Sequence, residues 1–309
     1  MLALSAVRAV HFAVAIQAVG TLLFVWIMGR LPEAVAERSA RRWLMRATTL
    51  LAVAMFPSGA AWIALQAADM SGHTVTEAWN DGAVGLLLFK THAGVVWWVR
   101  FAIAATLLID LCALASLRRM PSEVAVVVGL VLAIANFVSC AWLSHAASNA
   151  GPYASLHMAA HALHMLGVSL WLGGFVPLAM LVSRALHSGD RGTATAARAA
   201  SVSFGNIALL AVGTIVVSGI ATTALVVRDV SDLTTGTYAG LLAVKLVLFC
   251  LMLVLAAVNR LRLVPRLAAS NHEPAATRLW WSILAELVLG LVILLAVGAL
   301  GITSPGADE

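Results

Sequence analysis

Residues 123–145 read EVAVVVGLVLAIANFVSCAWLSH, an acidic residue followed by a mostly apolar run that carries no charge as far as His145. A helix needs roughly 20 such residues to cross the hydrocarbon core of a bilayer. A strand of a membrane barrel needs only about 10, with alternating polarity, and this run does not alternate. The segment therefore predicts a transmembrane α-helix.

Seven further runs of the same kind lie on either side of it, at about 3–29, 43–68, 92–117, 154–183, 203–227, 239–262 and 279–302. The whole chain is 62% hydrophobic and only 11% charged, against about 25% charged residues in soluble domains. This composition excludes a soluble globular protein. The predicted fold is an all-α polytopic membrane bundle of about eight transmembrane helices, and the first run is too long for the apolar part of a signal peptide.

The loops are short, the longest being about 69–91, so residues 1–309 are expected to form a single integral membrane domain. Of the 19 basic residues, 14 fall in the loops after the first, third, fifth and seventh runs. Cytoplasmic loops carry an excess of Lys and Arg. We therefore predict both termini on the periplasmic side, with the lipid bilayer rather than nucleic acid as the partner of this basic chain.

Seven of the nine histidines fall on the predicted outer side. Three of them, His157, His161 and His164, follow each other at i, i+4 and i+7, which places them within an arc of roughly 60° on one helix. Stacked imidazoles are costly in lipid unless they serve a purpose, and imidazole binds copper, zinc, iron and nickel. The predicted metal ligands are His11, His92, His145, His157, His161 and His164. The alternative is that these histidines only form hydrogen bonds across the bundle.

Sulfur donors close to the stripe, Met158, Met165 and Cys140, favour copper weakly, because thioether and thiolate groups select Cu(I). The predicted spans also contain charged residues, which mark functional sites by default or reach to headgroups. Arg100 and Lys245 lie in the predicted outer third, and Asp110 and Glu286 in the inner third. Glu286 is the best candidate for an inner relay or exit ligand.

Motifs for enzymatic chemistry are absent from the sequence: it has no HExxH, no GxSxG and no Walker A or dinucleotide fingerprint. All three cysteines lie inside apolar runs, which excludes a disulfide framework and a CxxC metal motif. We therefore do not expect an enzyme.

Several short motifs resemble the copper-resistance D (CopD/PcoD) family of bacterial inner-membrane proteins, most strongly over residues 200–267. The most specific is the run NRLRLVPRL at 259–267. Two other motifs in the C-terminal third are Ser218-Gly219 and Thr237-Tyr238, with Lys245 seven residues after the tyrosine. Two more lie earlier: His157, His161 and His164 leading into Trp171-Leu172-Gly173-Gly174, and Thr91-x2-Gly94-x2-Trp97-x2-Arg100. One departure is Ala239, where the family usually has glycine.

This resemblance implies eight spans, an inner-membrane location and a role in copper tolerance or in copper uptake from the periplasm. It also implies a periplasmic copper-binding CopC-like protein as partner, which would be a separate chain because no such domain is fused here. The family's histidine-rich motif falls on His157, His161 and His164.

Three functions follow as hypotheses. The first is copper capture at the outer face through the six histidines, with passage of copper across the membrane. The second is a b-type haem electron carrier, for which His11 and His164 are the natural axial pair at matched depth. The third is a scaffold without a metal of its own. The sequence does not decide the copper oxidation state, the direction of transport or the energy source.

Overall fold

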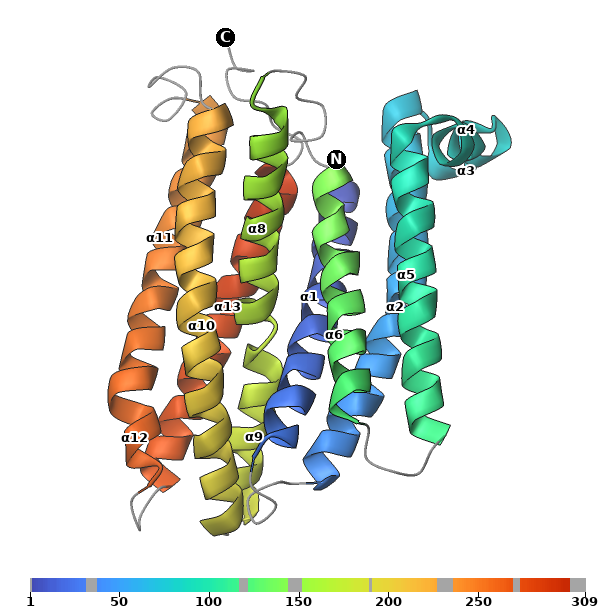
Figure 1. Cartoon of the computed structure of the whole chain (residues 1–309). Coiled ribbons are helices and arrows are strands. Elements are labelled where there is room, and N and C mark those ends of the chain that lie inside the picture. The colour runs from blue at the N-terminus through green and yellow to red at the C-terminus, as the bar shows by residue number, and fades with distance from the viewer. Residues whose placement is uncertain are drawn as a thin grey trace.

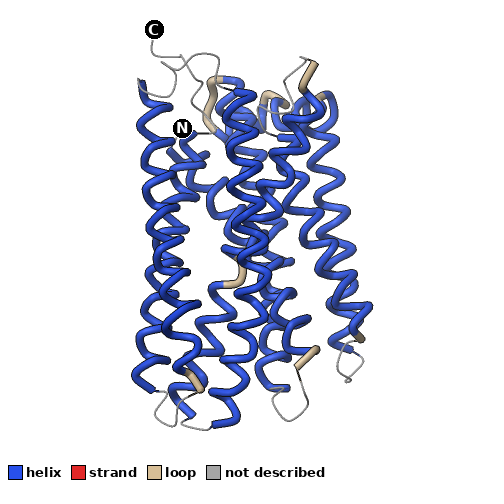
Figure 2. The backbone as a smooth tube through the Cα atoms, turned by 60° about the vertical axis from the view of Figure 1, so that its left-hand side comes forward, coloured by secondary structure: helices blue, strands red, loops and turns tan. Residues whose placement is uncertain are grey.

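The computed structural model describes residues 2–31, 38–116, 122–143, 152–188, 191–226, 236–268 and 273–300. Within these ranges it contains eight helical segments that are long and apolar enough to cross a membrane, and they run side by side as one bundle (Figures 1 and 2). The all-α membrane fold is thereby confirmed. The elements are α1 (Leu2–Gly29), α2 (Arg38–Ser71), α3 (Val75–Asn80), α4 (Ala83–Lys90), α5 (His92–Ser116), α6 (Glu123–Val138), η1 (Ser139–Leu143), α8 (Ala154–Leu172), α9 (Phe175–Ser188), α10 (Arg191–Val226), α11 (Gly236–Val258), η3 (Asn259–Leu263), α12 (Val264–Arg266) and α13 (Glu273–Leu300).

The first helix, α1, is the centre of the bundle. In the most apolar stretch of α1, 72% of the residues are buried. In the corresponding stretch of the span Ala239–Arg266, which contains most of α11, only 6% are buried. Helix α1 packs against α2, α6, α8, α9 and α13. Small residues such as Ala15, Ala18 and Gly20 are fully enclosed along its length, and they let neighbouring helices approach closely, as is usual in membranes.

The predicted fifth span, 154–183, corresponds to Ala154–Ser188. It differs from the prediction in being two helices, because α8 ends at Leu172 and α9 begins at Phe175, with a turn at Gly173 and Gly174 between them. A Cβ atom on Gly20 of α1 would lie 1.8 Å from the carbonyl oxygen of Gly173, so α1 crosses directly against the break. The side chain of Gln17 donates a hydrogen bond to that carbonyl at 3.0 Å. Irregular backbone at membrane depth persists only where protein groups satisfy it in this way.

Three other predicted boundaries differ from the structure. The predicted loop 69–91 contains α3 and α4, and α3 begins with a capping box in which Thr74 and Glu77 bond each other's backbone amides. These bonds lower the pKa of the Glu77 carboxyl. The helix predicted from residue 203 begins at Arg191, because the alanine-rich segment before it continues the same helix. The helix predicted to end at 262 passes into a single π-helical turn, η3.

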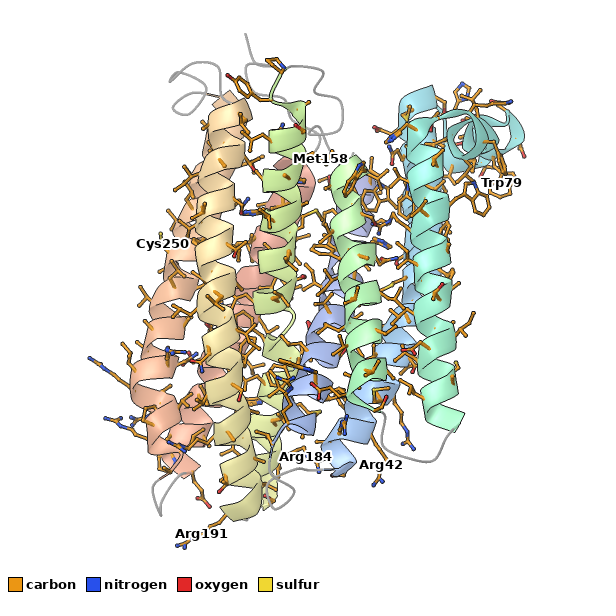
Figure 3. The ribbon with its side chains drawn as sticks, viewed as in Figure 1. Arg42, Trp79, Met158, Arg184, Arg191 and Cys250 are labelled. Atoms are coloured by element: carbon orange, nitrogen blue, oxygen red, sulfur yellow. The ribbon has the colours of Figure 1, made fainter. Side chains whose placement is uncertain are left out.

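The start of α1 and the end of α13 lie at the same end of the bundle as α3 and α4 (Figure 1). We call this the outer end, following the charge count, and the opposite one the inner end. Figure 3 shows Arg42, Arg184 and Arg191 gathered at the inner end. The even number of spans agrees with this arrangement, while the side of the membrane that each end faces stays a prediction.

Candidate functional site

The three histidines of α8 begin near the outer end, and the deepest of them, His164, contacts α10, against which α8 packs. His157 is buried, and its Nδ1 has no hydrogen-bond partner among the described residues. His164 is half-buried, with Nδ1 3.2 Å from the carbonyl oxygen of Ile215 and 3.3 Å from Ser218 Oγ, both on α10. A Cβ atom on Gly219 would come within 3.5 Å of the His164 ring, so the glycine leaves room beside it.

The imidazoles of this α8 stripe (His157, His161 and His164) lie close enough to interact electrostatically in sequence, His157 with His161 and His161 with His164. Lys245 of α11 is half-buried and acts electrostatically on both His161 and His164. The sequence singled out Lys245 as a charge inside a span. The structure adds that its positive charge acts on the two deeper histidines of the stripe.

His11 of α1 lies in a different environment, a buried cluster built around Arg100 of α5. Arg100 is 1% exposed, and one of its terminal nitrogens faces three acceptors, the backbone carbonyl oxygen of Asn136 at 2.7 Å, Ser139 Oγ at 3.0 Å and Cys140 Sγ at 2.6 Å. Its other terminal nitrogen lies 2.6 Å from His11 Nε2. The guanidinium group also lies over the Trp97 ring, 4.9 Å from its centroid. Arg100 is therefore held inside the protein and does not reach to headgroups.

The hydrogen bonds of His11 fix its tautomer. Ser58 Oγ donates to the Ala54 carbonyl at 2.6 Å, so it accepts from His11 Nδ1 at 2.8 Å. The guanidinium group has only donors, which makes His11 Nε2 the acceptor of the Arg100 bond. Both ring nitrogens of His11 are thus occupied, and His11 can ligate a metal only if Arg100 releases it.

One further predicted ligand, His92, is not brought into either cluster. His92 is exposed at the start of α5, and His145 lies outside the described residues. Within the part of the chain that the structure describes, no three His, Cys, Asp or Glu side chains form a group that could hold a metal ion. His11 and His164, the pair considered for haem, contact different helices: His11 contacts α2 and α5, and His164 contacts α10. Of the sulfur donors, Cys140 accepts from Arg100, while Met158 and Met165 pack in an apolar cluster.

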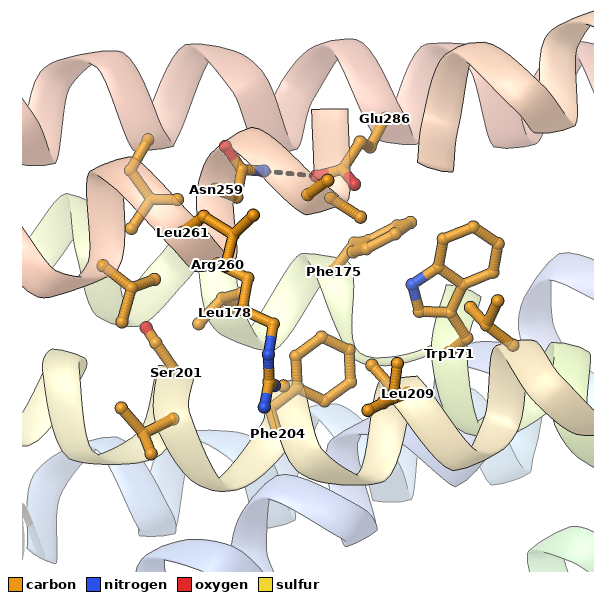
Figure 4. Close-up of a pocket in the computed structure, with 18 of the residues that line it drawn as sticks. Trp171, Phe175, Leu178, Ser201, Phe204, Leu209, Asn259, Arg260, Leu261 and Glu286 are labelled. Atoms are coloured by element: carbon orange, nitrogen blue, oxygen red, sulfur yellow. Dashed lines mark hydrogen bonds between the residues drawn. The ribbon is translucent and has the colours of Figure 1, made fainter. Parts of the chain in front are cut away.

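The inner half of the bundle contains a cavity of about 500 Å³ between α9, α10, α13 and the continuous segment α11–η3–α12. Its walls include Trp171, Phe175 and Phe204, and Glu286 lines its deep side (Figure 4). Glu286 is 2% exposed and accepts a hydrogen bond from Asn259 Nδ2 at 2.8 Å. Among the described residues, Glu286 Oε1 and Asn259 Oδ1 have no hydrogen-bond partner, and we call them the open acceptors.

Some of these features had a signal in the sequence and others had none. Glu286 stood out as a carboxylate inside a span, and Arg100 as an arginine one turn after Trp97. Asn259 opens the motif NRLRLVPRL. The cavity and the bond from Asn259 to Glu286 had no sequence signal, because they depend on several helices meeting and on the π-helical turn. Such turns occur frequently at functional sites.

Two protein-family models together match most of the chain. Residues 1–156 match the model described as copper resistance protein D-like, N-terminal domain, and residues 198–300 match the model described as copper resistance protein D.

Curated relatives agree with these matches. The chain is 28% identical over 308 residues to the inner membrane protein YebZ of Escherichia coli (strain K12), covering 97% of each chain. It is 28% identical over 275 residues to the copper resistance protein D of Pseudomonas syringae pv. tomato, covering 85% of this chain and 84% of that one. It is 25% identical over 290 residues to the copper transport protein CutJ of Bacillus subtilis (strain 168), covering 93% of this chain and 50% of CutJ. No solved structure matches.

Proposed function

Because this chain belongs to the copper resistance protein D family and is a multi-pass protein of the bacterial inner membrane, we propose that it takes up copper at the periplasmic face and passes it inward. The observation that carries the proposal is the α8 stripe. It offers successive imidazoles from the outer end toward the middle of the bundle, and His164 lies about 10 Å deeper than His157 at the helical rise per residue. Neutral imidazole is a good copper ligand.

Availability of lone pairs supports the α8 stripe over His11 as the entry site. A ring nitrogen of His157 is buried without a partner among the described residues, whereas His11 uses both of its nitrogens within the protein. A copper ion arriving at His157 therefore displaces no protein hydrogen bond at that nitrogen. His92 and His145 stay predicted contributors at the outer end.

Lys245 gives this pathway a means of release. Its ammonium group acts on His161 and His164, and a positive charge beside a bound cation weakens binding. We propose that Lys245 keeps copper from being held too tightly at the deeper histidines. Delivery would come from the separate CopC-like protein that the resemblance implies, docking at the outer end.

The haem alternative has no support from the relatives, whose names refer to copper or to membrane location. A scaffold without its own metal differs from the copper proposal in one measurable property, the metal content of the purified protein.

The test is copper content after purification from copper-supplemented cells, for the unaltered protein and a His157→Ala/His161→Ala/His164→Ala variant. We expect near-stoichiometric copper in the former and almost none in the latter. His187→Ala is the matched control, because His187 lies near the inner end and, among the described residues, hydrogen-bonds to Ser183 one turn earlier in its own helix. Equal copper in all three proteins would overturn the assignment, and absence of copper from the unaltered protein would favour the scaffold.

Acidification gives a second readout on the same samples. Protons compete with copper for imidazole nitrogens, so metal affinity falls as the pH falls. The unaltered protein should therefore lose copper progressively when the pH is lowered, and should rebind it when the pH is restored. Copper that stays bound at acidic pH would indicate ligands other than histidine.

A further inference from the structure

The cavity in the inner half of the bundle is separate from the α8 stripe and has the dimensions of a small-molecule site. Its volume of about 500 Å³ falls within the roughly 300–1,000 Å³ typical of ligand pockets. Such pockets combine mostly apolar walls with a few placed polar groups. Here the walls include three aromatic side chains, Trp171, Phe175 and Phe204.

The polar groups at the deep side accept hydrogen bonds. Glu286 and Asn259 are 2% and 8% exposed, and Asn259 already uses its amide donor on Glu286. Figure 4 shows both side chains extending into the same interior space from α13 and η3. Buried acceptors without donors are costly in an apolar environment, so the open acceptors favour a ligand that brings O–H or N–H groups.

The cavity opens toward lipid. Two of its lining residues, Leu209 of α10 and Leu261 of η3, are 62% and 73% exposed on the apolar flank of the bundle. Near them the Arg260 guanidinium group bridges to Asn206 Oδ1 at 2.9 Å. A ligand entering between these residues would come from the inner leaflet, with hydrogen-bond donors at the mouth and acceptors in the interior.

We propose that this cavity binds a lipid-soluble quinol of the membrane pool, with one ring hydroxyl donating to the open acceptors and the ring lying against the aromatic walls. The phosphate of a phospholipid brings only acceptors, whereas the open acceptors need a donor, and acyl chains offer neither donors nor a flat ring. Copper prefers nitrogen and sulfur ligands, whereas the open acceptors are two oxygens in an apolar setting. The site is therefore distinct from the copper pathway.

The test compares decylubiquinol with its dimethyl ether, which keeps the ring and the tail and lacks both hydroxyl donors. Binding is measured by isothermal titration to metal-free protein in quinone-free nanodiscs, with empty nanodiscs subtracted for partitioning. We expect the quinol to bind at least about tenfold more tightly than the ether, because a buried acceptor left without a donor costs about 1–3 kcal/mol. Equal binding of the two compounds, or binding of neither, would overturn the proposal.

Variants then locate the site. Glu286→Leu should remove the preference for the quinol over the ether. Asp110→Leu should keep it, because Asp110 is another carboxylate inside a span but lies on α5, beside Gly129 of α6. Loss of the preference in both variants, or in neither, would contradict the placement in this cavity. The comparison of the two compounds on the unaltered protein decides the proposal even where Glu286→Leu does not fold.

Discussion

The outer half of this molecule contains histidines in two settings, the Arg100 cluster around His11 and the α8 stripe. In the first, Ser58 and Arg100 occupy both ring nitrogens, and the nearest charge is a buried cation. In the second, a buried nitrogen of His157 lacks a partner among the described residues, and Gly219 leaves space beside His164. The comparison teaches that the number of histidines overstates the number of ligands. A histidine is available to metal only where its lone pair has no other use.

The largest expected effect is a loss of folding stability when the hydrogen bonds of the Arg100 cluster are removed. Arg100→Leu leaves Cys140 Sγ and His11 Nε2 without their donor in an apolar interior. We expect a loss of about 3 kcal/mol in the free energy of unfolding, measured by SDS titration of the folded protein. Arg260→Leu is the control, because Arg260 is exposed and makes one bond to Asn206.

If Arg100 holds the fold and takes no part in copper binding, the folded fraction of Arg100→Leu should still bind copper at the α8 stripe. An Arg100→Leu variant as stable as the unaltered protein would contradict the structural role of Arg100. Loss of copper from its folded fraction would contradict the separation of the Arg100 cluster from the copper site.

A smaller loss of stability is expected from a substitution where α1, which carries His11, crosses the break between α8 and α9. Gly20→Ala places a Cβ atom 1.8 Å from a backbone oxygen of Gly173, which cannot move aside as a side chain would. Overpacking of this kind costs about 1–3 kcal/mol, and the same SDS titration measures it. Gly213→Ala on α10 meets nothing within 4 Å and should leave stability unchanged or slightly raised. Equal stability of the two variants would mean that the helices do not meet as described.

The smallest expected effect is a change in copper affinity on substitution of Lys245. Lys245→Met removes the charge beside His161 and His164 while keeping a long apolar side chain, and should raise copper affinity by about tenfold. Competition with a calibrated copper chelator measures it. Lys90→Met is the control, since Lys90 lies at the end of α4 in the outer connection. Weaker copper binding in Lys245→Met would show that Lys245 does not oppose the metal.

Long-range apolar patterning made the fold predictable. Spans such as 123–145 and 239–262 are recognisable because lipid tolerates only helices with satisfied backbones and long apolar surfaces. The break at Gly173 was not predicted, since glycines are common in membrane helices and the residue that demands one, Gly20, is distant in sequence. Helix periodicity alone was enough to bring the three α8 histidines to one face.

The sequence could not predict which side chains surround each candidate residue. His11 looked as available as His157 until Ser58, from another helix, was placed against its ring. Glu286 was recognised from its charge, but its partner Asn259 depends on the π-helical turn that follows α11. Local pattern therefore identified the candidate residues, and tertiary packing decided which of their atoms have partners among the described residues.

The most direct test of this account is copper K-edge X-ray absorption of the copper-loaded protein, with the imidazole ligands counted in the unaltered chain, in His11→Ala and in His161→Ala. The account predicts the same imidazole count in His11→Ala as in the unaltered chain, and a lower count in His161→Ala. A lower count in His11→Ala together with an unchanged count in His161→Ala would place copper in the Arg100 cluster and contradict the account.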